Sequence, residues 1–306
     1  MERKLKEKIL FSQSVVDAKD AKIHILAPAL QYAAAVFEGI RGYWSDAEQQ
    51  LFIFRYKEHI ERLESSMKMM RFERPAAMDT LKEDVLSLVR ENGLKKNCHI
   101  RVLSLLDGPP NITATGPVIM AVTAGPFQPN VFVDTGMKAV VSSWNRIADK
   151  ASPPRIKTVA NYVNGRLAAM QAKHDGYDAP IMLTEAGYVS EGPQANIIMI
   201  RDGRVVIPRC TDGILESITR NTLVELFVNE LGIETVERAI DRSELYIAQE
   251  LFFCGSGWEI RPVTSVDGIP VGDGNVGPIT RKIMDLYFDC VSGKISRYRD
   301  WLTPVW

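Results

Sequence analysis

The sequence predicts an α+β protein of two domains. Its 306 residues are about twice the length of an average domain of roughly 150 residues. Strand-like and helix-like patterns alternate before residue 125, and two prolines and a glycine at 125–130 then break both kinds of element. A longer unit of helices and turn-punctuated strands follows. We expect a small α/β domain at 1–124, an interdomain linker at 125–135 and a large domain at 136–306.

The elements of the first domain follow from the spacing of apolar residues. A helix is predicted at 58–72, where Leu63 and Met67 share one face. Asp79 can cap a second helix, and Gly93 suits the stop at its end. Short apolar runs predict strands at 22–26, 51–54, 98–106 and 118–124.

The second domain mixes helices with strands that end in turn residues. A helix is predicted at 158–174, with Val163 and Leu167 spaced along one side. Ser217 can cap another helix, and Asp202-Gly203 marks a hairpin. Strands are expected at 138–144, 179–184, 188–190, 196–201, 205–208 and 251–254, and further helices at 217–231 and 278–290.

Composition excludes several classes of protein. The net charge of -1 argues against a broad nucleic-acid or membrane footprint. The N-terminus has alternating charges and no apolar segment typical of a secretory signal. The four cysteines are widely and irregularly spaced, which predicts reduced thiols in a cytoplasmic protein. The four histidines lack metal-ligand spacing, so we expect no metal site.

Residues 272–277 match the dinucleotide-binding pattern G-x-G-x-x-G and precede a predicted helix. Such a site needs a further strand and an acidic residue downstream. Only the helix and a short tail follow here, so we interpret the motif as a turn. A nicotinamide oxidoreductase remains a competing interpretation that this context disfavours.

Seven local motifs carry the chemical information. They are YAAAVFEGIRGY (32–43), KEHIERL (57–63), SSWNR (142–146), KTVANY (157–162), YVSEGPQAN (188–196), GILESITR (213–220) and GSGWEI (255–260). Together they resemble the fold-type IV pyridoxal-phosphate (PLP) enzymes, and among these the branched-chain amino-acid aminotransferases. The resemblance implies a small N-terminal α/β domain and a larger C-terminal domain with a β-barrel-like core. It also implies PLP between them and a homodimer, or a higher oligomer, with shared active sites.

The resemblance assigns the central roles to three residues. Lys157 matches the Schiff-base lysine, whose amine must be deprotonated to attack the cofactor's aldehyde and then moves a proton. Glu191 matches the carboxylate that keeps the pyridine nitrogen protonated, so that the ring withdraws electrons. Glu185 lies only six residues earlier, but the Ser-Glu-Gly context favours Glu191. Tyr162 would hydrogen-bond the cofactor's phenolic oxygen.

The sequence also predicts a binding site for the phosphate group of PLP. Ile218 and Thr219 open a predicted helix, where backbone N–H groups and the helix dipole attract an anion. Ser256 lies between two glycines and offers a hydroxyl and further N–H groups. Arg62 would add a charge-assisted contact, although other arginines lie near it in the sequence.

The resemblance also implies the residues that bind the substrate. They are Tyr32, Phe37, Arg41, His99, Arg101, Gly257 and Trp258. Arg101 matches the arginine that meets the distal carboxylate of glutamate or 2-oxoglutarate. An arginine within an apolar strand is costly to bury without a partner, which independently favours a function, although an ion pair across the sheet would also satisfy it.

These features predict a PLP-dependent aminotransferase acting between an amino acid, with branched-chain L-amino acids favoured, and a 2-oxo acid such as 2-oxoglutarate. Departures from the family pattern at His99, Val102, Phe127 and Trp258 leave the amino donor open. A transaminase of D-amino acids or primary amines and an aminodeoxychorismate lyase are alternatives of the same fold type. A non-catalytic binding protein is another, but it would be expected to lack Lys157 or Glu191. No nucleic-acid or membrane partner is expected.

Overall fold

The computed structural model describes residues 8–127 and 130–306. The N-terminal segment 1–7 and linker positions 128 and 129, both of which carried predictions, lie outside the described residues. The chain divides into two compact units. Unit 1 comprises Met1–Gln128, Ile156–Ala160 and Cys290–Trp306, and unit 2 comprises Pro129–Arg155 and Asn161–Asp289. Each unit combines a sheet with helices, which confirms the predicted α+β class.

Unit 1 is built on a seven-stranded antiparallel sheet of order β15-β4-β3-β5-β6-β1-β2. Its strands are β1 (Lys8–Phe11), β2 (Ser14–Asp17), β3 (Ala35–Ser45), β4 (Gln50–Phe54), β5 (Cys98–Leu106), β6 (Val118–Pro126) and β15 (Leu302–Pro304). Its helices are α1 (Pro28–Gln31), α2 (Tyr56–Met69) and α3 (Leu81–Glu91), with short 3₁₀ turns at Ala76–Met78 and Ser296–Trp301.

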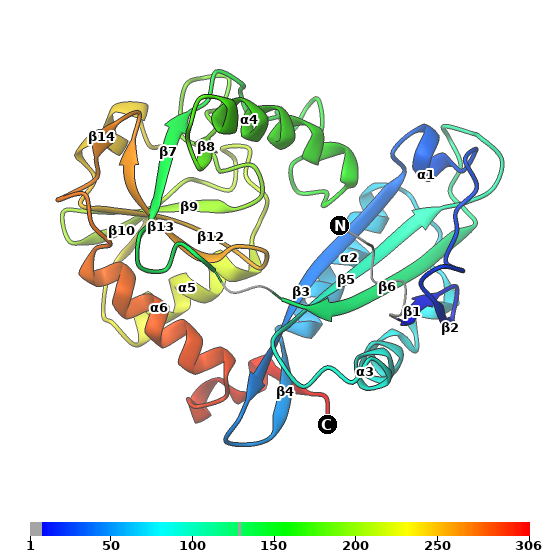
Figure 1. Ribbon diagram of the computed structural model, residues 1–306. Coiled ribbons are helices and arrows are strands. Elements are labelled where there is room, and N and C mark those ends of the chain that lie inside the picture. The colour runs from blue at the N-terminus through cyan, green and yellow to red at the C-terminus, as the bar shows by residue number, and fades with distance from the viewer. Residues whose placement is uncertain (1–7, 128–129) are drawn as a thin grey trace. The chain divides into compact units, whose positions relative to one another are not determined.

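Helices α2 and α3 cover one face of this sheet, and Figure 1 shows α2 running along β3. Val36 and Ile40 of β3 pack in one buried cluster with Leu63 and Met67 of α2. Every second side chain of a strand points to the same face, so this cluster fixes which residues of β3 face away from α2. The predicted helix 58–72 and its apolar face are therefore confirmed, with slightly different bounds.

Two expectations for unit 1 are wrong, and one strand was missed. Residues 22–26 form no strand, and a turn there leads into α1. The longest strand, β3, was not predicted, because nearly all of its residues are buried and it lacks the alternation of a half-exposed strand. Asp79 does not cap α3, since its carboxylate accepts a hydrogen bond from Arg74 at 2.7 Å and Thr80 occupies the N-cap position.

Residues Ile156–Ala160 return to unit 1 and complete the edge of β3. Strand β4 pairs only with the last part of β3, from Gly42 onward. Thr158 forms a bridge with Val36 on the remaining part, and its hydroxyl donates to the Ala35 carbonyl at 2.8 Å. A segment far away in the sequence thus becomes part of the unit 1 sheet.

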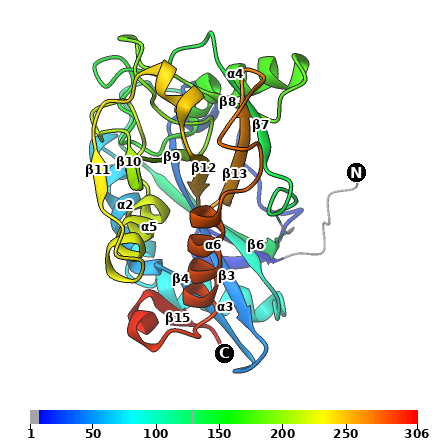
Figure 2. The same cartoon turned by 90° about the vertical axis from the view of Figure 1, so that its left-hand side faces the viewer.

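Unit 2 contains an eight-stranded mixed sheet of order β11-β10-β9-β12-β13-β7-β8, with β14 paired to β13. The strands are β7 (Met137–Val141), β8 (Ala179–Ile181), β9 (Asn196–Arg201), β10 (Arg204–Ile207), β11 (Thr235–Glu237), β12 (Glu250–Gly255), β13 (Glu259–Val266) and β14 (Ile269–Pro270). The helices are α4 (Tyr162–His174), α5 (Ile218–Asn229) and α6 (Pro278–Val291, whose last two residues belong to unit 1), with 3₁₀ turns at Val159–Asn161 and Arg242–Ile247. Helix α5 packs against β12 and β11, and Figure 2 shows it next to β11. No helix among the described residues has the length and apolar character needed to cross a membrane.

The helix cap and the hairpin turn predicted in unit 2 are both present. Ser217 caps α5 by accepting the Arg220 N–H at 3.2 Å. Asp202 and Gly203 both have positive φ, at 51° and 71°, as the predicted hairpin turn requires.

Helix α4 has its apolar side at the surface of unit 2. The apolar side that includes Val163, Leu167 and Met170 is exposed, at 60%, 42% and 53%. The opposite side is buried and consists of small residues. Gly165 lies on it, and a Cβ there would overlap the Pro193 carbonyl oxygen. The close approach of α4 to the rest of unit 2 therefore needs small residues.

The glycine motif at 272–277 has a structural explanation. The Glu250 carboxylate, 6% exposed, accepts the N–H groups of Ile279 and Thr280 at 2.9 and 2.6 Å and the Thr280 hydroxyl at 2.6 Å. It thereby occupies the N-terminus of α6, where a dinucleotide's phosphates would bind. A Cβ at Gly277 would overlap this carboxylate. The motif thus makes room for an internal cap, and the dinucleotide interpretation has no support.

We predict that Gly277→Ala lowers the free energy of unfolding by about 1–3 kcal/mol, because the added methyl group overpacks the Glu250 carboxylate. Urea unfolding of the full chain measures this change. Gly255→Ala is the matched control, since a Cβ there meets only ordinary contacts at 3.5 Å or more. If Gly277→Ala and Gly255→Ala unfold alike, the proposed packing around Glu250 is wrong.

Candidate functional site

One face of the unit 1 sheet gathers several of the predicted site residues. The register of β3 and β5 pairs Gly39 with Arg101 and Arg41 with His99. Residues that pair across antiparallel strands point to the same face, and Phe37 lies on this face by alternation. A Cβ at Gly39 would lie 3.0 Å from His99 Nε2, so the glycine makes room for the imidazole.

Aromatic rings support the cations on this face. The Arg101 guanidinium carbon lies 3.8 Å from the centre of the Phe37 ring, and that of Arg41 lies 3.1 Å from the Phe127 ring. Lys157 Nζ lies 5.0 Å from the same Phe37 ring. Such cation–π contacts hold positive charge beside an apolar wall.

His99 is the neutral member of this group. Burial, followed by the nearby Arg41 and Arg101 cations, lowers the pKa of the His99 imidazole to about 4. The ring is therefore uncharged at neutral pH and has one nitrogen that can donate and one that can accept a hydrogen bond.

The backbone of Lys157 is fixed on both sides. Its N–H donates to Ser66 Oγ on α2 at 3.2 Å, and its carbonyl accepts the Phe37 N–H on β3 at 3.0 Å. The side chain is half-buried. Lys157 thus belongs to unit 1, although most of the sequence around it belongs to unit 2.

Arg62 lies on the other face of β3, where α2 packs. Its Nε and Nη2 donate to the two carboxylate oxygens of Glu38 at 2.7 and 2.8 Å. His59 Nδ1 lies 2.7 Å from Glu38 Oε2. Desolvation tends to raise the pKa of Glu38, but the charge of Arg62 and the hydrogen bonds from Arg62 and His59 outweigh it and hold the pKa at about 2. Glu38 and His59 were not among the predicted site residues.

Glu191 is a buried carboxylate of unit 2, with 4% exposure. Its Oε1 pairs with Arg146 Nη2 at 2.7 Å. Its Oε2 accepts hydrogen bonds from Asn196 Nδ2 at 2.6 Å and from the Leu215 N–H at 3.3 Å. Arg146 in turn donates through Nε to the Gly213 carbonyl at 3.2 Å. These bonds tie Glu191 to the segment that leads into α5.

Arg146 was missed as a functional residue. Its motif SSWNR contributed to the resemblance, but nothing local indicates that its side chain reaches Glu191. Only the general rule that a buried carboxylate needs a cation could have suggested it.

Helix α5 begins directly after the Glu191 contacts. The Ser217 hydroxyl accepts the Arg220 N–H. Ile218 and Thr219 stand in the first turn, so their N–H groups have no acceptor within the helix. Thr219 is buried, with 1% exposure. This helix start is suited to an anion.

The predicted residues after β12 form a tight turn. The Trp258 N–H donates to the Gly255 carbonyl at 3.0 Å, which places Ser256 and Gly257 at the tip. The Trp258 ring packs edge-on against Phe253, with centroids 5.4 Å apart, so its indole is part of the unit 2 core. Gly257 is exposed.

Tyr162 and Tyr32 lie at helix ends. Tyr162 begins α4 after Asn161, whose amide donates to the Pro153 carbonyl at 3.0 Å. Tyr32 is the C-cap of α1 and is 44% exposed, so unit 1 alone does not enclose its ring.

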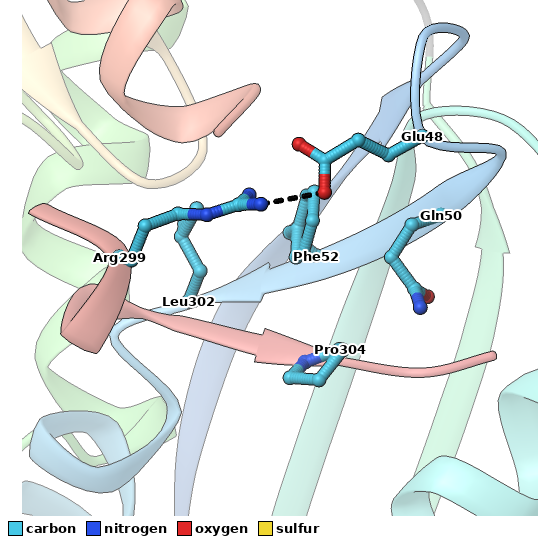
Figure 3. Close-up of a pocket in the computed structure, with 6 residues that line it drawn as sticks. All are labelled: Glu48, Gln50, Phe52, Arg299, Leu302 and Pro304. Carbon is cyan, nitrogen blue, oxygen red and sulfur yellow. Dashed lines mark hydrogen bonds and ion pairs between the residues drawn. The ribbon is translucent and has the colours of Figure 1, made fainter. Parts of the chain in front are cut away.

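A surface pocket of unit 1 is lined by other residues. Figure 3 shows a hollow of unit 1 where the ion pair of Arg299 and Glu48 lies over Phe52. None of the predicted site residues lines it. Within residues 8–127 and 130–306, no three His, Cys, Asp or Glu side chains are placed to bind a metal ion together.

Comparisons with known proteins identify the family of this chain. The family model of the class IV aminotransferases matches residues 35–266. A probable branched-chain-amino-acid aminotransferase of Aquifex aeolicus (strain VF5) is 38% identical over 97% of this chain and 96% of its own length.

Two solved structures share the fold over almost the whole chain. The branched-chain amino acid aminotransferase of Thermobaculum terrenum, in its PLP-form, has a TM-score of 0.94 and 37% identity, covering 99% of this chain and 100% of its own. The branched-chain aminotransferase of the archaeon Thermoproteus uzoniensis, solved with norvaline, has a TM-score of 0.92 and 38% identity, covering 98% of this chain and 99% of its own. The chain therefore belongs to the class IV aminotransferases.

Proposed function

We propose that this enzyme is a PLP-dependent branched-chain aminotransferase, which moves an amino group between a branched-chain L-amino acid and a 2-oxo acid such as 2-oxoglutarate. The observation that carries the proposal is the fixed position of Lys157. Its backbone is bound to α2 and β3, and its amine lies over Phe37 on a face with two arginines. The functions of the relatives named above favour this substrate class over D-amino acids, amines or a lyase reaction.

The residues of the chain fit PLP. A buried carboxylate is present for a protonated ring nitrogen, and a helix start is present for a phosphate. Two buried polar atoms nearby in the sequence, Ser190 Oγ and Asn196 Oδ1, have no hydrogen-bond partner among the described residues. Buried polar atoms usually have one, which suggests a polar ligand or water. When bound, PLP supplies an aldehyde and a ring that withdraws electrons from the substrate's α-carbon.

We assign the cofactor contacts by chemistry. Glu191, oriented by Arg146 and Asn196, would accept a hydrogen bond from the ring nitrogen. The hydroxyl of Tyr162 would donate to the phenolic oxygen. The phosphate would be bound by the residues Arg62, Ile218, Thr219 and Ser256, which offer a guanidinium, a helix start and a turn.

Lys157 would hold the cofactor through its amine and act as the base and acid of the reaction. When it is not bound to the cofactor, this amine would take the proton of the substrate's α-carbon and later return one.

The cationic face of unit 1 would bind the substrate. Arg101 would pair with the distal carboxylate of an acidic substrate, and neutral His99 would donate or accept a hydrogen bond beside it. The ring of Phe37 would contact an apolar side chain. Tyr32, Arg41, Gly257 and Trp258 complete the proposed substrate set.

We also propose a homodimer with shared active sites, located in the cytoplasm. Exposed apolar side chains gather around α1, where Ile25, Leu30 and Tyr32 are 68%, 56% and 44% exposed. On unit 2, Val163 and Met170 are exposed on the same side of α4. Groups of exposed apolar side chains are typical of surfaces that bind another chain.

We predict that Lys157→Ala lowers the rate of the half-reaction with L-leucine by at least about 10³-fold, because no other group is assigned to move the proton. Borohydride treatment of the yellow wild-type protein should fix a pyridoxyl group on Lys157, identified by peptide mass. Lys173→Ala, a change of an exposed lysine on α4, should react normally. A label on another lysine would refute the assignment.

We predict that Glu191→Gln slows the same half-reaction on the order of 100-fold or more, because an amide does not stabilise the positive charge on the ring nitrogen. Stopped-flow absorbance measures this rate. Glu185→Gln, a change of an exposed carboxylate in the same region, should leave the rate near that of wild type. Equal rates for the two variants would exclude Glu191 from the proposed role.

We predict that Arg101→Met raises the KM for 2-oxoglutarate about tenfold to a hundredfold, since a hydrogen bond to a charged group contributes roughly 1.5–3 kcal/mol. The KM for 4-methyl-2-oxopentanoate, which lacks the distal carboxylate, should change little. Steady-state kinetics with both acceptors separate the two effects. An equal rise for both would show that Arg101 acts only on the structure.

A further inference from the structure

The guanidinium of Arg62 is held from behind by two buried side chains. Glu38 is 0% exposed and binds it through both oxygens, and His59 is 1% exposed and binds Glu38. We call Glu38 and His59 the Arg62 support. The Arg62 side chain itself is 14% exposed, so it lies where the buried support meets more accessible surface.

The position of Glu38 is unfavourable for stability alone. It stands among Val36, Ile40 and Val102 on the face of the sheet that packs against α2. A charge buried there loses its hydration, and replacing a buried ion pair by apolar residues is often neutral or stabilising. The retention of a charged group at this position therefore needs a reason other than packing.

The geometry of the support fixes the orientation of Arg62. Nε and Nη2 bind the two oxygens of one carboxylate, and this bidentate arrangement sets the plane of the guanidinium. Only the opposite edge, with Nη1 and the outer hydrogen of Nη2, can meet another partner. A planar guanidinium held in this way loses little conformational freedom when it binds an anion.

His59 fixes the orientation of the carboxylate. Glu38 is ionised and can only accept hydrogen bonds, so the 2.7 Å contact requires a proton on His59 Nδ1. Burial lowers the pKa of His59, which leaves a neutral ring that adds no charge to the group. His59 and Arg62 lie three residues apart on α2, so one turn of the helix supplies both contacts.

We propose that Glu38 and His59 are positioning residues that aim the Arg62 guanidinium at the phosphate of the cofactor and so determine how much this phosphate contributes to cofactor affinity. The proposal rests on the proposed function, in which Arg62 binds that phosphate. It adds that Arg62 is effective only while its support is intact.

The experiment compares cofactor binding with and without the phosphate group. The full-length enzyme is freed of cofactor and titrated with PLP and with pyridoxal. Absorbance gives both Kd values, and the ratio compared is the Kd for pyridoxal divided by the Kd for PLP. Arg62→Ala should reduce this ratio at least about tenfold, as expected for one charge-assisted hydrogen bond. Glu38→Gln should reduce it severalfold or more. Glu38→Gln combined with Arg62→Ala should reduce it no further than Arg62→Ala alone.

A second pair of variants tests His59 separately, in case Glu38→Gln does not fold. Asn places an N–H close to the position of His Nδ1, so His59→Asn should keep most of the ratio. His59→Leu should lower it. Glu58→Gln is the matched control, because Glu58 lies on the same helix and pairs with Arg55 at 2.7 Å near the surface. It should leave the ratio unchanged.

The outcomes distinguish the two levels of the proposal. An unchanged ratio in Arg62→Ala would refute the phosphate role of Arg62 and the present inference with it. A reduced ratio in Arg62→Ala, with wild-type ratios in Glu38→Gln and His59→Leu, would overturn only the inference. A further fall when Glu38→Gln is added to Arg62→Ala would also overturn it, because the support would then act on something other than Arg62.

Discussion

The burial of the Glu38 carboxylate is the constraint on which the arrangement of unit 1 depends. Strand β3 alternates between two faces, so placing Phe37, Gly39 and Arg41 on the cationic face forces residue 38 into the face that packs against α2. A carboxylate there must be paired, and removing one partner of a buried pair costs about 3–5 kcal/mol. The register of α2 against β3 is therefore fixed by the cation at position 62 and the imidazole donor at position 59.

The sequence predicted those parts of the fold whose signals are local. Ser217 and the Asp202-Gly203 turn need only neighbouring residues, and they were correct. Strand β3 was missed because both of its faces are covered, so it shows no alternation. The apolar side of α4 was recognised, but its exposure was not, because periodicity shows which residues share a side and does not show what covers that side.

The candidate site was predicted by motif, while its supporting contacts were not. Lys157 and Glu191 stand in motifs that resemble one family. Their partners are distant in the sequence, as Ser66 lies 91 residues from Lys157, and no spacing rule links such pairs. Glu38 stood within a recognised motif, yet its role became visible only when the strand register placed it opposite α2. An ionisable residue inside an apolar run was the available signal.

Three buried carboxylates show how the partner decides the role. Glu250 accepts N–H groups and a hydroxyl at the start of α6, and this set of neutral donors makes it a helix cap. Glu38 and Glu191 each face an arginine. In Glu38, both oxygens are used by side chains of α2, so the carboxylate acts through Arg62. In Glu191, the donors also include a backbone N–H of the segment leading into α5, so the same bonds that stabilise the charge also orient the helix start proposed to bind phosphate. Residue type alone assigns none of these roles, because each follows from what the carboxylate is bound to.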